Sequence, residues 1–272
     1  MKRKTVQKET SKSLKTFYIY FVLVFLLIGI SLFIKLIFVI QSSKYDGRHH
    51  FTIAITKDQK VKQVMSFSPQ VPSLAVLTIK DENISINSLT KDHGIAADAQ
   101  VEVNNAVTLN QDTTTTLWDT TRNYAAIKTD ATFIDLIRLT LLSRDIISNN
   151  KVMREIRLND NKPETNTLIA RALNDPTISS ENISIQIINA SNVSGLGQRL
   201  GRVFTNMGAN VVEVSTSYTP QMTSKIQYFG ERSYTHEQIE KYLGYPVSEL
   251  NRQPIADIVI ILGEDMKNTR KF

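Results

Sequence analysis

The stretch from residue 187 to 214, IINASNVSGLGQRLGRVFTNMGANVVEV, has the order of a nucleotide-binding turn: an apolar strand, a glycine-containing turn, a helix and a second strand. Gly195, Gly197 and Gly201 give the series G-L-G-Q-R-L-G, one residue longer than the dinucleotide-binding fingerprint. Glu213 follows the first glycine by 18 residues, near the acidic position of that fold. One interpretation of these residues is therefore a turn that holds a pyrophosphate.

The same turn has a second interpretation that needs no ligand. Ser191, Asn192 or Ser194 can cap a helix that begins near Gly195, because short polar side chains accept hydrogen bonds from the first backbone N–H groups of a helix. Gly201 would lie in the helix body, where a small residue permits close packing. The unit around this turn has only about 85 residues, with no second mononucleotide-binding half. We therefore favour capping over cofactor binding.

The loop before this helix is still the candidate ligand-binding surface. An exposed helix N-terminus attracts an anion or a carbohydrate hydroxyl, and the residues around this one are small and polar. The candidate ligand-binding residues are Asn189, Ser191, Asn192, Ser194 and Gly195.

Other residue types exclude several classes of site. The chain has no cysteine, which excludes disulfides, thiol catalysis and cysteine-ligated zinc or iron–sulfur centres. His49 and His50 are adjacent without a third ligand nearby, while His93 and His236 are isolated, so we expect no metal site. No nucleophile elbow supports a serine hydrolase. Aromatic residues that can stack on a sugar ring or fill a core are Trp118, Tyr124 and Tyr228.

An apolar segment near the start of the chain must be separated from the folded part. Residues 17–40 carry one charge, Lys35, and as a helix they would span roughly 36 Å, enough to cross a bilayer. Lys35 lies near one end, where its side chain can reach the headgroups. A cleaved signal peptide has a shorter apolar region and a small-residue cleavage site. We expect an uncleaved transmembrane signal anchor.

The charge distribution predicts the orientation of that anchor. The first 16 residues hold six basic residues against one acidic residue, and Lys35 adds a seventh positive charge. The positive-inside rule then keeps the N-terminus in the cytoplasm and exports the rest. Residues 41–272 carry 25 basic and 25 acidic residues, so the sequence pI of about 9.3 comes from the membrane-proximal tail. We expect the membrane as a partner and no nucleic acid.

The exported part begins with a pattern typical of strands. Apolar runs at 51–56, 61–67 and 74–79 predict a meander, and a short strand is expected at 84–87. A polar stretch follows from 88 to 115. A broad apolar stripe predicts a helix at 131–147, with Asp130 and Thr132 as available caps. Residues 148–180 are mostly polar, and we interpret them as a linker with a short helix at about 165–173.

The C-terminal part alternates strands with helices. Strands are expected at 183–188, 210–215, 224–229 and 256–262, and helices at 195–207 and 236–244. The predicted fold class is therefore α/β: an N-terminal transmembrane helix followed by two small α/β domains with mixed sheets and helices.

The C-terminal part resembles the domain found after LytR-CpsA-Psr proteins of the bacterial envelope. The series that carries the resemblance is I-x-I-x-I-I-N-A-S-N-V-S-G-L, then G-A-N-V-V-E-V, S-K-I-Q-Y and A-D-I-V-I-I-L-G-E-D, over about residues 182–265. The family pattern is a strand ending in Asn, a loop to Gly-Leu, a helix ending at Gly, and a last strand that runs into Gly-x-Asp.

The preceding region resembles a shortened catalytic domain of the same family. FTIAITKDQKVKQVMSFSPQVPSLAVLTIKDE is similar to the opening of that domain, which ends in Ser-Ile-Pro-Arg-Asp. This chain has Thr78, Ile79, Lys80 and Asp81 there, without the proline and with lysine for arginine. The family enzymes transfer polyprenyl-pyrophosphate-linked glycopolymers to peptidoglycan with several arginines and a metal, and no later arginine-rich segment of that kind occurs here. Lysine does not replace arginine at a bidentate phosphate site.

These observations predict five segments. They are a basic cytoplasmic tail at 1–16, a transmembrane signal anchor at 17–40, a reduced LytR-CpsA-Psr-like α/β domain at 48–147, a linker at 148–180 and a LytR C-terminal-like α/β domain at 181–266. The resemblance implies an accessory protein that binds peptidoglycan, a wall glycopolymer or a LytR-CpsA-Psr ligase, without a cofactor. The alternative is a divergent phosphotransferase in which Lys80 and Asp81 are the catalytic candidates and Mg²⁺ is the metal.

Overall fold

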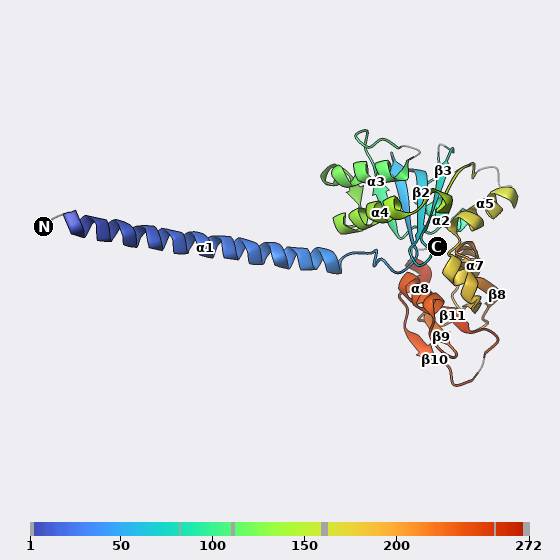
Figure 1. Ribbon diagram of the computed structural model, residues 1–272. Helices are drawn as coiled ribbons and strands as arrows, with labels where there is room; N and C mark the ends of the chain where they lie inside the picture. Colours follow the sequence, from blue (N-terminus) through green and yellow to red (C-terminus); the bar gives the residue numbers. More distant parts are fainter. Residues whose placement is uncertain (1–2, 82, 110–111, 159–162, 253, 269–272) are drawn as a thin grey trace. The chain divides into compact units, whose positions relative to one another are not determined.

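The computed structural model describes residues 3–81, 83–109, 112–158, 163–252 and 254–268. Its first helix, α1 (Arg3–Gln41), contains an apolar segment from Phe17 to Gln41, in which a window of 18 residues has a mean hydropathy of 3.0 (Figure 1). By length and composition this segment can cross a membrane. The predicted apolar helix is therefore confirmed.

Residues 44–272 contain two mixed sheets, as the predicted fold class requires. The first sheet has the order β5-β4-β1-β2-β3-β6. Its strands are β1 (Phe51–Lys57), β2 (Lys60–Ser68), β3 (Ser73–Ile79), β4 (Ala99–Glu102), β5 (Lys128–Thr129) and β6 (Lys151–Ile156). The helices of this part are α2 (Ile86–His93), α3 (Thr113–Arg122), α4 (Phe133–Asp145) and α5 (Pro163–Leu173). Short 3-10 turns lie at Tyr124–Ala126 and Ser148–Asn150.

Alternation of apolar side chains along the strands builds a core on each face of the first sheet. Ile53 and Met65 belong to the cluster that packs against α3 and α4. Val64 and Leu77 belong to the opposite cluster, which packs against α2 and α5. The apolar strands predicted at 51–56, 61–67 and 74–79 are confirmed, and both of their faces are covered.

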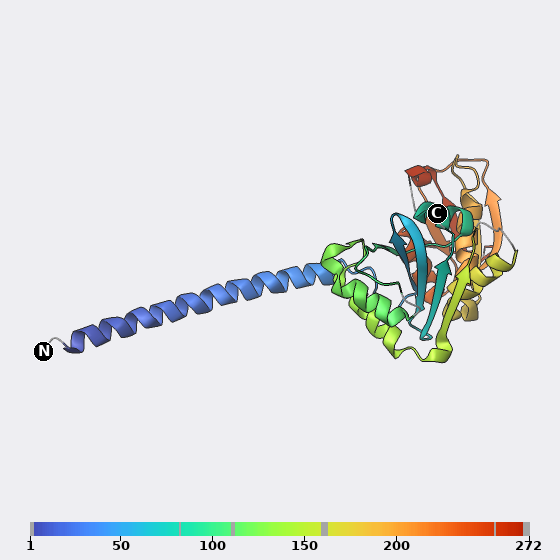
Figure 2. The same cartoon turned by 90° about the horizontal axis from the view of Figure 1, so that it is seen from above.

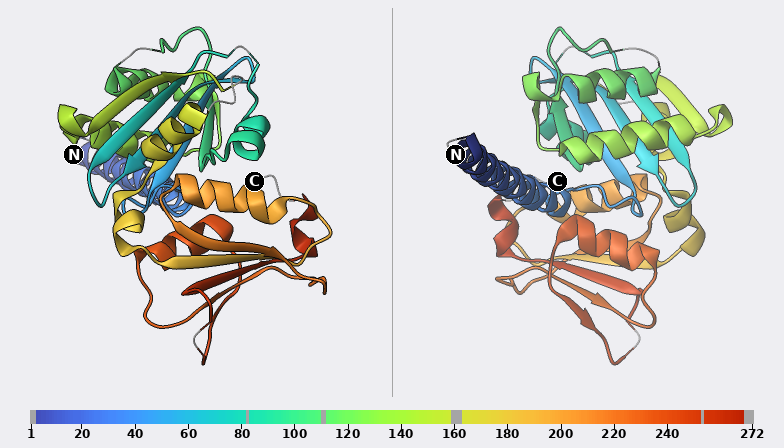
Figure 3. Two further views of the ribbon diagram at one scale, coloured as in Figure 1. Left: turned by 90° about the vertical axis from the view of Figure 1, so that its right-hand side faces the viewer. Right: turned by 60° about the vertical axis from the view of Figure 1, so that its left-hand side comes forward.

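The second sheet has the order β10-β9-β11-β7-β8, with β9 antiparallel to β11 and the other pairs parallel. Its strands are β7 (Ser184–Asn189), β8 (Asn210–Thr216), β9 (Lys225–Tyr228), β10 (Val247–Glu249) and β11 (Ile258–Leu262). The remaining helices are α6 (Pro176–Glu181), α7 (Leu196–Asn206) and α8 (Tyr234–Leu243), with a 3-10 turn at Glu264–Asn268. Figure 3 shows α7 and α8 on the same face of this sheet. Their apolar residues share one core with β7, β9 and β11.

The strand expected at 84–87 is wrong. Ser85 is instead the N-cap of α2, and its hydroxyl accepts a hydrogen bond from the backbone N–H of Ser88 at 3.1 Å. The Ser88 hydroxyl in turn accepts from the Ser85 backbone N–H at 3.0 Å. Two serines three residues apart form a capping box. This capping box stabilises a helix start in a segment whose alternating pattern, I-S-I-N, had suggested a strand.

Parts that we expected to be irregular contain regular elements. Residues 148–180, expected as a linker with a short helix at about 165–173, include β6, which pairs in parallel with β3 from Leu74 to Ile79 and lies beside it in Figure 2. The expected short helix is confirmed as α5, whose Ile169 is fully buried. The polar stretch 88–115 includes most of α2, β4 and the start of α3. Asp112 caps α3 and accepts from the backbone N–H of Thr114 at 3.1 Å.

One of the two expected caps of α4 is confirmed. Thr132 is the N-cap, and its hydroxyl accepts from the backbone N–H of Asp135 at 3.1 Å. Asp130, the other expected cap, contacts residues outside α4: its carboxylate accepts from the Gln100 backbone N–H at 2.6 Å and from Lys44 Nζ at 2.7 Å. It therefore joins β4 to the segment before β1.

Candidate functional site

The loop between β7 and α7 is closed by the side chain of Asn189. Its Nδ2 donates to the carbonyl of Val193 at 2.9 Å, and its Oδ1 accepts from the hydroxyl of Ser191 at 2.7 Å. Asn189 is buried, whereas Asn192 and Ser194 are exposed. The backbone N–H of Asn192 donates to the carboxylate of Glu264 at 2.7 Å. Asn189 and Ser191 therefore fix the loop, while Asn192 and Ser194 present side chains to solvent.

The predicted side-chain cap of α7 is wrong. The N-cap is Gly195, with φ of 73°, and none of Ser191, Asn192 and Ser194 caps the helix. The hydroxyl of Ser191 is used inside the loop, where it donates to Asn189 and accepts from the backbone N–H of Val193 at 3.2 Å. A positive φ suits glycine, which has no Cβ to clash. Gly195 is therefore required by the turn itself.

The other two glycines of the G-L-G-Q-R-L-G series face the second sheet. A Cβ added to Gly197 would lie 3.0 Å from Cγ1 of Val214, and one added to Gly201 would lie 3.2 Å from Cγ2 of the same residue. Glu213, at the acidic position of the dinucleotide pattern, accepts a hydrogen bond from Gln186 Nε2 at 2.8 Å. The packing interpretation thus accounts for the glycines without a cofactor.

An open pocket of about 720 Å³ lies where α2 meets the start of α7. We call it the α2–α7 pocket; the lining residues that matter here are Lys91, Asp92, His93, Gly195, Arg199 and Arg202. Arg199 Nη1 donates to the carbonyl of Ser194 at 3.3 Å, and Arg202 Nη1 donates to the carbonyl of Asp92. Of the predicted ligand-binding residues, Gly195 lines this pocket. The sequence signal that we missed is the pair of arginines three residues apart on α7, which share one helix face.

The contact between α2 and α7 is fixed by Asn206. Its Nδ2 donates to the carbonyl of His93 at 3.1 Å and to that of Gly94 at 2.9 Å. These carbonyls belong to the C-terminal end of α2, which has no intrahelical partners for them. A side chain of α7, which packs on the second sheet, therefore caps α2, which packs on the first sheet.

A second pocket, of about 600 Å³, is lined by residues of both charge signs. Lys44 and Lys241 line it together with Asp98 and Asp130. Lys44 Nζ lies 2.7 Å from the Asp130 carboxylate. Lys241 pairs instead with Asp46, which does not line the pocket. The lining holds two positive and two negative side chains, so this pocket has no marked preference for an anion or a cation.

Lys80 and Asp81 lie at the end of β3 and contact the strand beside it. Lys80 Nζ is 3.0 Å from the Glu155 carboxylate, and Asp81 Oδ2 accepts from the backbone N–H of Leu158 at 2.5 Å. Glu164 lines the same open surface as Lys80 and Glu155. Arg157 also lines this surface, so a pyrophosphate placed at Lys80 would meet two cations and two carboxylates. The described residues around Lys80 therefore offer no net positive charge for a phosphate.

A buried polar network joins the two parts of residues 44–272, and sequence reasoning did not find it. His50 Nε2 and the Ser66 hydroxyl lie 2.7 Å apart, and the backbone N–H of His50 donates to the hydroxyl of Tyr234 at 2.8 Å. The Tyr234 hydroxyl donates to Asp175 Oδ2 at 2.8 Å. Burial lowers the pKa of His50, and burial together with the Asp175 charge raises that of Tyr234. A neutral imidazole and a protonated phenol are thus favoured.

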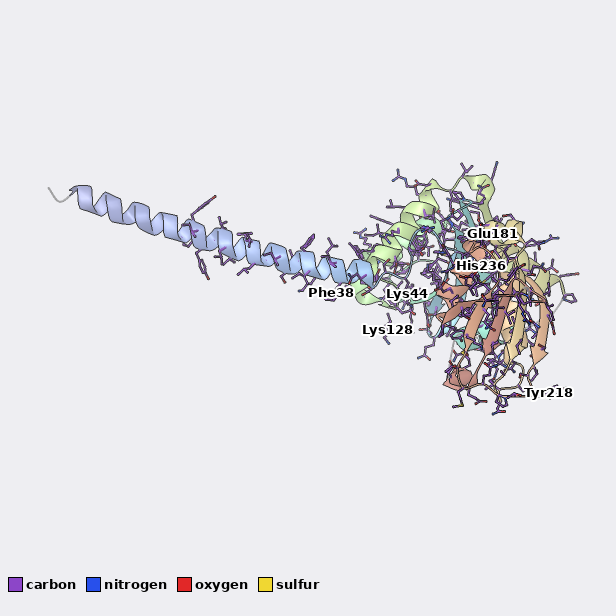
Figure 4. The ribbon with its side chains drawn as sticks, turned by 90° about the horizontal axis from the view of Figure 1, so that it is seen from below. Phe38, Lys44, Lys128, Glu181, Tyr218 and His236 are labelled. Atoms are coloured by element: carbon purple, nitrogen blue, oxygen red, sulfur yellow. The ribbon has the colours of Figure 1, made fainter. Side chains whose placement is uncertain are left out.

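A carboxylate of α6 occupies the N-terminus of α8. Glu181 accepts hydrogen bonds from the backbone N–H of Thr235 at 2.8 Å and that of Tyr234 at 3.1 Å. Figure 4 shows Glu181 and His236 at this end of α8, whereas Tyr218 lies at the periphery. Although burial raises the pKa of Glu181, the hydrogen bonds from Thr235 and Ser233 lower it overall. Negative charge at a helix start stabilises the helix.

The remaining histidine, His49, is buried beside two exposed charged residues. His49 Nδ1 is 2.6 Å from the Asp46 carboxylate, and Lys241 Nζ is 2.9 Å from the same group. Burial raises the pKa of Asp46, but hydrogen bonds from His49 and Lys241 outweigh it and lower the pKa strongly. Within the described residues, no group of three or more His, Asp and Glu side chains is placed to hold a metal ion.

The comparisons with known proteins identify one part of the chain. Residues 182–265 match the model of the family described as LytR cell envelope-related transcriptional attenuator. The search of curated proteins gave no match. The match begins two residues before β7 and ends in the turn after β11, so it contains the whole second sheet, α7, α8 and the Asn189 loop. Residues 182–265 of this chain therefore form a LytR C-terminal domain.

Proposed function

We propose that this chain is a single-pass membrane protein whose folded part lies outside the cytoplasm and binds a component of the bacterial cell envelope. The observation that carries this proposal is the family match over residues 182–265, since that family is described as cell envelope-related. The apolar segment Phe17–Gln41 supplies the anchor, and the six basic residues before it favour a cytoplasmic N-terminus. The component is peptidoglycan, a wall glycopolymer or a LytR-CpsA-Psr ligase.

The role is that of an accessory protein in wall glycopolymer assembly rather than a transferase. The contacts of Lys80 and Asp81 support this choice, because Glu155 and the Leu158 backbone use the side chains that the alternative needs. Under the phosphotransferase alternative, Mg²⁺-dependent binding of a polyprenyl pyrophosphate would be abolished by Lys80→Ala. Under the accessory role, Lys80→Ala leaves binding to the envelope unchanged.

Two experiments test the proposal. The detergent-solubilised full chain should sediment with isolated sacculi, and Tyr218→Ala serves as a control, because that fully exposed side chain lies outside the pockets described above. Tags at both termini, followed by protease treatment of intact cells, should remove the C-terminal tag and leave the N-terminal one. Failure to sediment would exclude peptidoglycan and wall glycopolymer as the component and leave the ligase, whereas a protected C-terminal tag would contradict the proposal.

A further inference from the structure

We propose that the α2–α7 pocket binds a phosphate group carried by an envelope glycopolymer, with Lys91 and Arg199 as the residues that contact it. This inference rests on the proposed function, because it names the chemistry of the component that the chain binds.

The first argument is the local excess of positive charge. Lys91 on α2 and both Arg199 and Arg202 on α7 line one pocket, although more than a hundred residues separate the two helices. Asp92 is acidic, and burial lowers the pKa of His93, which favours its neutral form. Three positive charges therefore face one negative charge. Residues 41–272 as a whole carry equal numbers of basic and acidic residues, so this excess is a local feature.

The second argument is a hydrogen-bond donor left without a partner. Among the described residues, Arg199 Nε is buried and donates to no acceptor, while Nη1 of the same guanidinium donates to Ser194. A buried donor without an acceptor is unfavourable. The guanidinium fork matches two oxygens of a phosphate, so a phosphate bound in the pocket would supply the missing acceptor once the Arg199 side chain turns towards it.

The third argument is the fit of the pocket to its ligand. A volume of about 720 Å³ is larger than one phosphate and is in the range of pockets that hold a phosphate with an attached sugar. Gly195 lines the pocket, and no side chain caps α7 there, so the positive end of the helix adds to the attraction. Asn166, on α5, adds an amide that can bind a sugar hydroxyl.

The test measures binding of inorganic pyrophosphate to the full-length protein in phosphatidylcholine nanodiscs by isothermal titration calorimetry. The wild-type chain should bind, with an affinity that falls as salt is added. Arg199→Gln should weaken binding about tenfold, because it removes a charge-assisted hydrogen bond. Lys91→Gln should weaken it several-fold, and this exposed side chain can be changed without disturbing the fold even if Arg199→Gln disturbs it. Arg144→Gln removes an exposed arginine on α4 outside the pocket and should have no effect.

The source of the phosphate is tested with sacculi and with lipid. Sacculi stripped of phosphodiester polymers should retain less wild-type protein than untreated sacculi, and Arg199→Gln should show the same deficit on untreated ones. No pyrophosphate binding by the wild type, or equal weakening by Arg144→Gln, overturns the inference. Unchanged retention on stripped sacculi also overturns it while leaving the proposed function intact. Competition by phosphatidylglycerol nanodiscs but not by soluble glycopolymer would overturn the glycopolymer assignment.

Discussion

The hydroxyl of Tyr234 donates a hydrogen bond to Oδ2 of Asp175 at 2.8 Å. The hydroxyl oxygen of Tyr234 also accepts from the backbone N–H of His50, so one phenol bridges α8, the N-cap of α6 and the segment that enters β1. Asp175 is fully buried. The hydrogen bond between Tyr234 and His50 therefore joins the LytR C-terminal domain to the segment that enters the first sheet.

Replacing Tyr234 with phenylalanine should destabilise the protein. The change leaves Asp175 Oδ2 without this donor and the His50 backbone N–H without its acceptor, which costs about 1–3 kcal/mol. The free energy of unfolding can be measured by urea titration of the full chain in detergent. Tyr218→Phe, at a fully exposed position, should change it by less than about 0.5 kcal/mol. Equal stabilities for the two variants would contradict the bridging role.

Asn206→Ala should loosen the contact between α2 and α7. The change removes the amide that donates to the carbonyls of His93 and Gly94. Because Asn206 is buried, we expect the free energy of unfolding to fall by about 1–2 kcal/mol. Hydrogen exchange should accelerate in the peptide covering α2. Asn192→Ala, on an exposed side chain of the β7–α7 loop, is the matched control and should leave that peptide protected. Unaltered exchange in α2 for Asn206→Ala would argue against the contact.

Gly197→Ala should reveal why the glycines of α7 are needed. Alanine is favoured over glycine in a helix by about 1 kcal/mol, so a freely exposed substitution would stabilise the protein. Here the added Cβ meets Val214, and overpacking of about 1–3 kcal/mol should reverse the sign. The double variant Gly197→Ala, Val214→Ala should recover part of the loss, which a double-mutant cycle of unfolding free energies measures. Additive effects would count against packing as the explanation.

Stability should fall as the pH drops from about 7 towards 5. Burial lowers the pKa values of His50, His93 and His236 below their ordinary value. The unfolded chain therefore binds more protons than the folded one below roughly pH 6.5, and stability is full above that pH and lost beneath it. Asp175 and Lys241 act on His50 in opposite directions. Thermal unfolding of the full chain between pH 5 and pH 8 measures the effect.

His50→Gln separates this histidine from the others. A glutamine can keep a hydrogen bond to Ser66 but cannot titrate, so the variant should show a shallower loss between pH 7 and pH 5 than the wild type. Carboxylates such as Glu181, whose pKa is lowered by its hydrogen bonds to Thr235 and Ser233 despite burial, act only below roughly pH 4.5. A pH profile that is identical in both proteins would mean that His50 does not titrate in this window.

The regular apolar strands were predictable, and the elements with polar or threonine-rich sequences were not. Continuous apolar runs located β1 to β3, because both faces of these strands are buried. The run of threonines in α3 disfavours a helix by propensity, yet Asp112 caps it and the hydroxyls of Thr116 and Thr120 donate to the carbonyls four residues before them. β6 has an exposed edge position, so KVMREI lacks a clear period.

The candidate site was predictable as a loop but not as a pocket. The order of strand, turn and helix located the segment around Gly195, because these features are adjacent in the sequence. The α2–α7 pocket also needs Lys91, and the polar junction needs His50 beside Tyr234, which are separated by 184 residues. These groups come together only because the region that contains the first sheet packs against the region that contains the second sheet.

The position of β6 has a practical consequence for dividing this chain into fragments. A fragment that stops at residue 147 keeps β3 but loses the strand that covers its backbone from Leu74 to Ile79. A mostly buried apolar strand would then offer unpaired amides and carbonyls along its length, which invites aggregation with a second copy. A soluble product therefore has to extend past Ile156, and the boundary at residue 147, suggested by the polar composition of residues 148–180, would yield inclusion bodies.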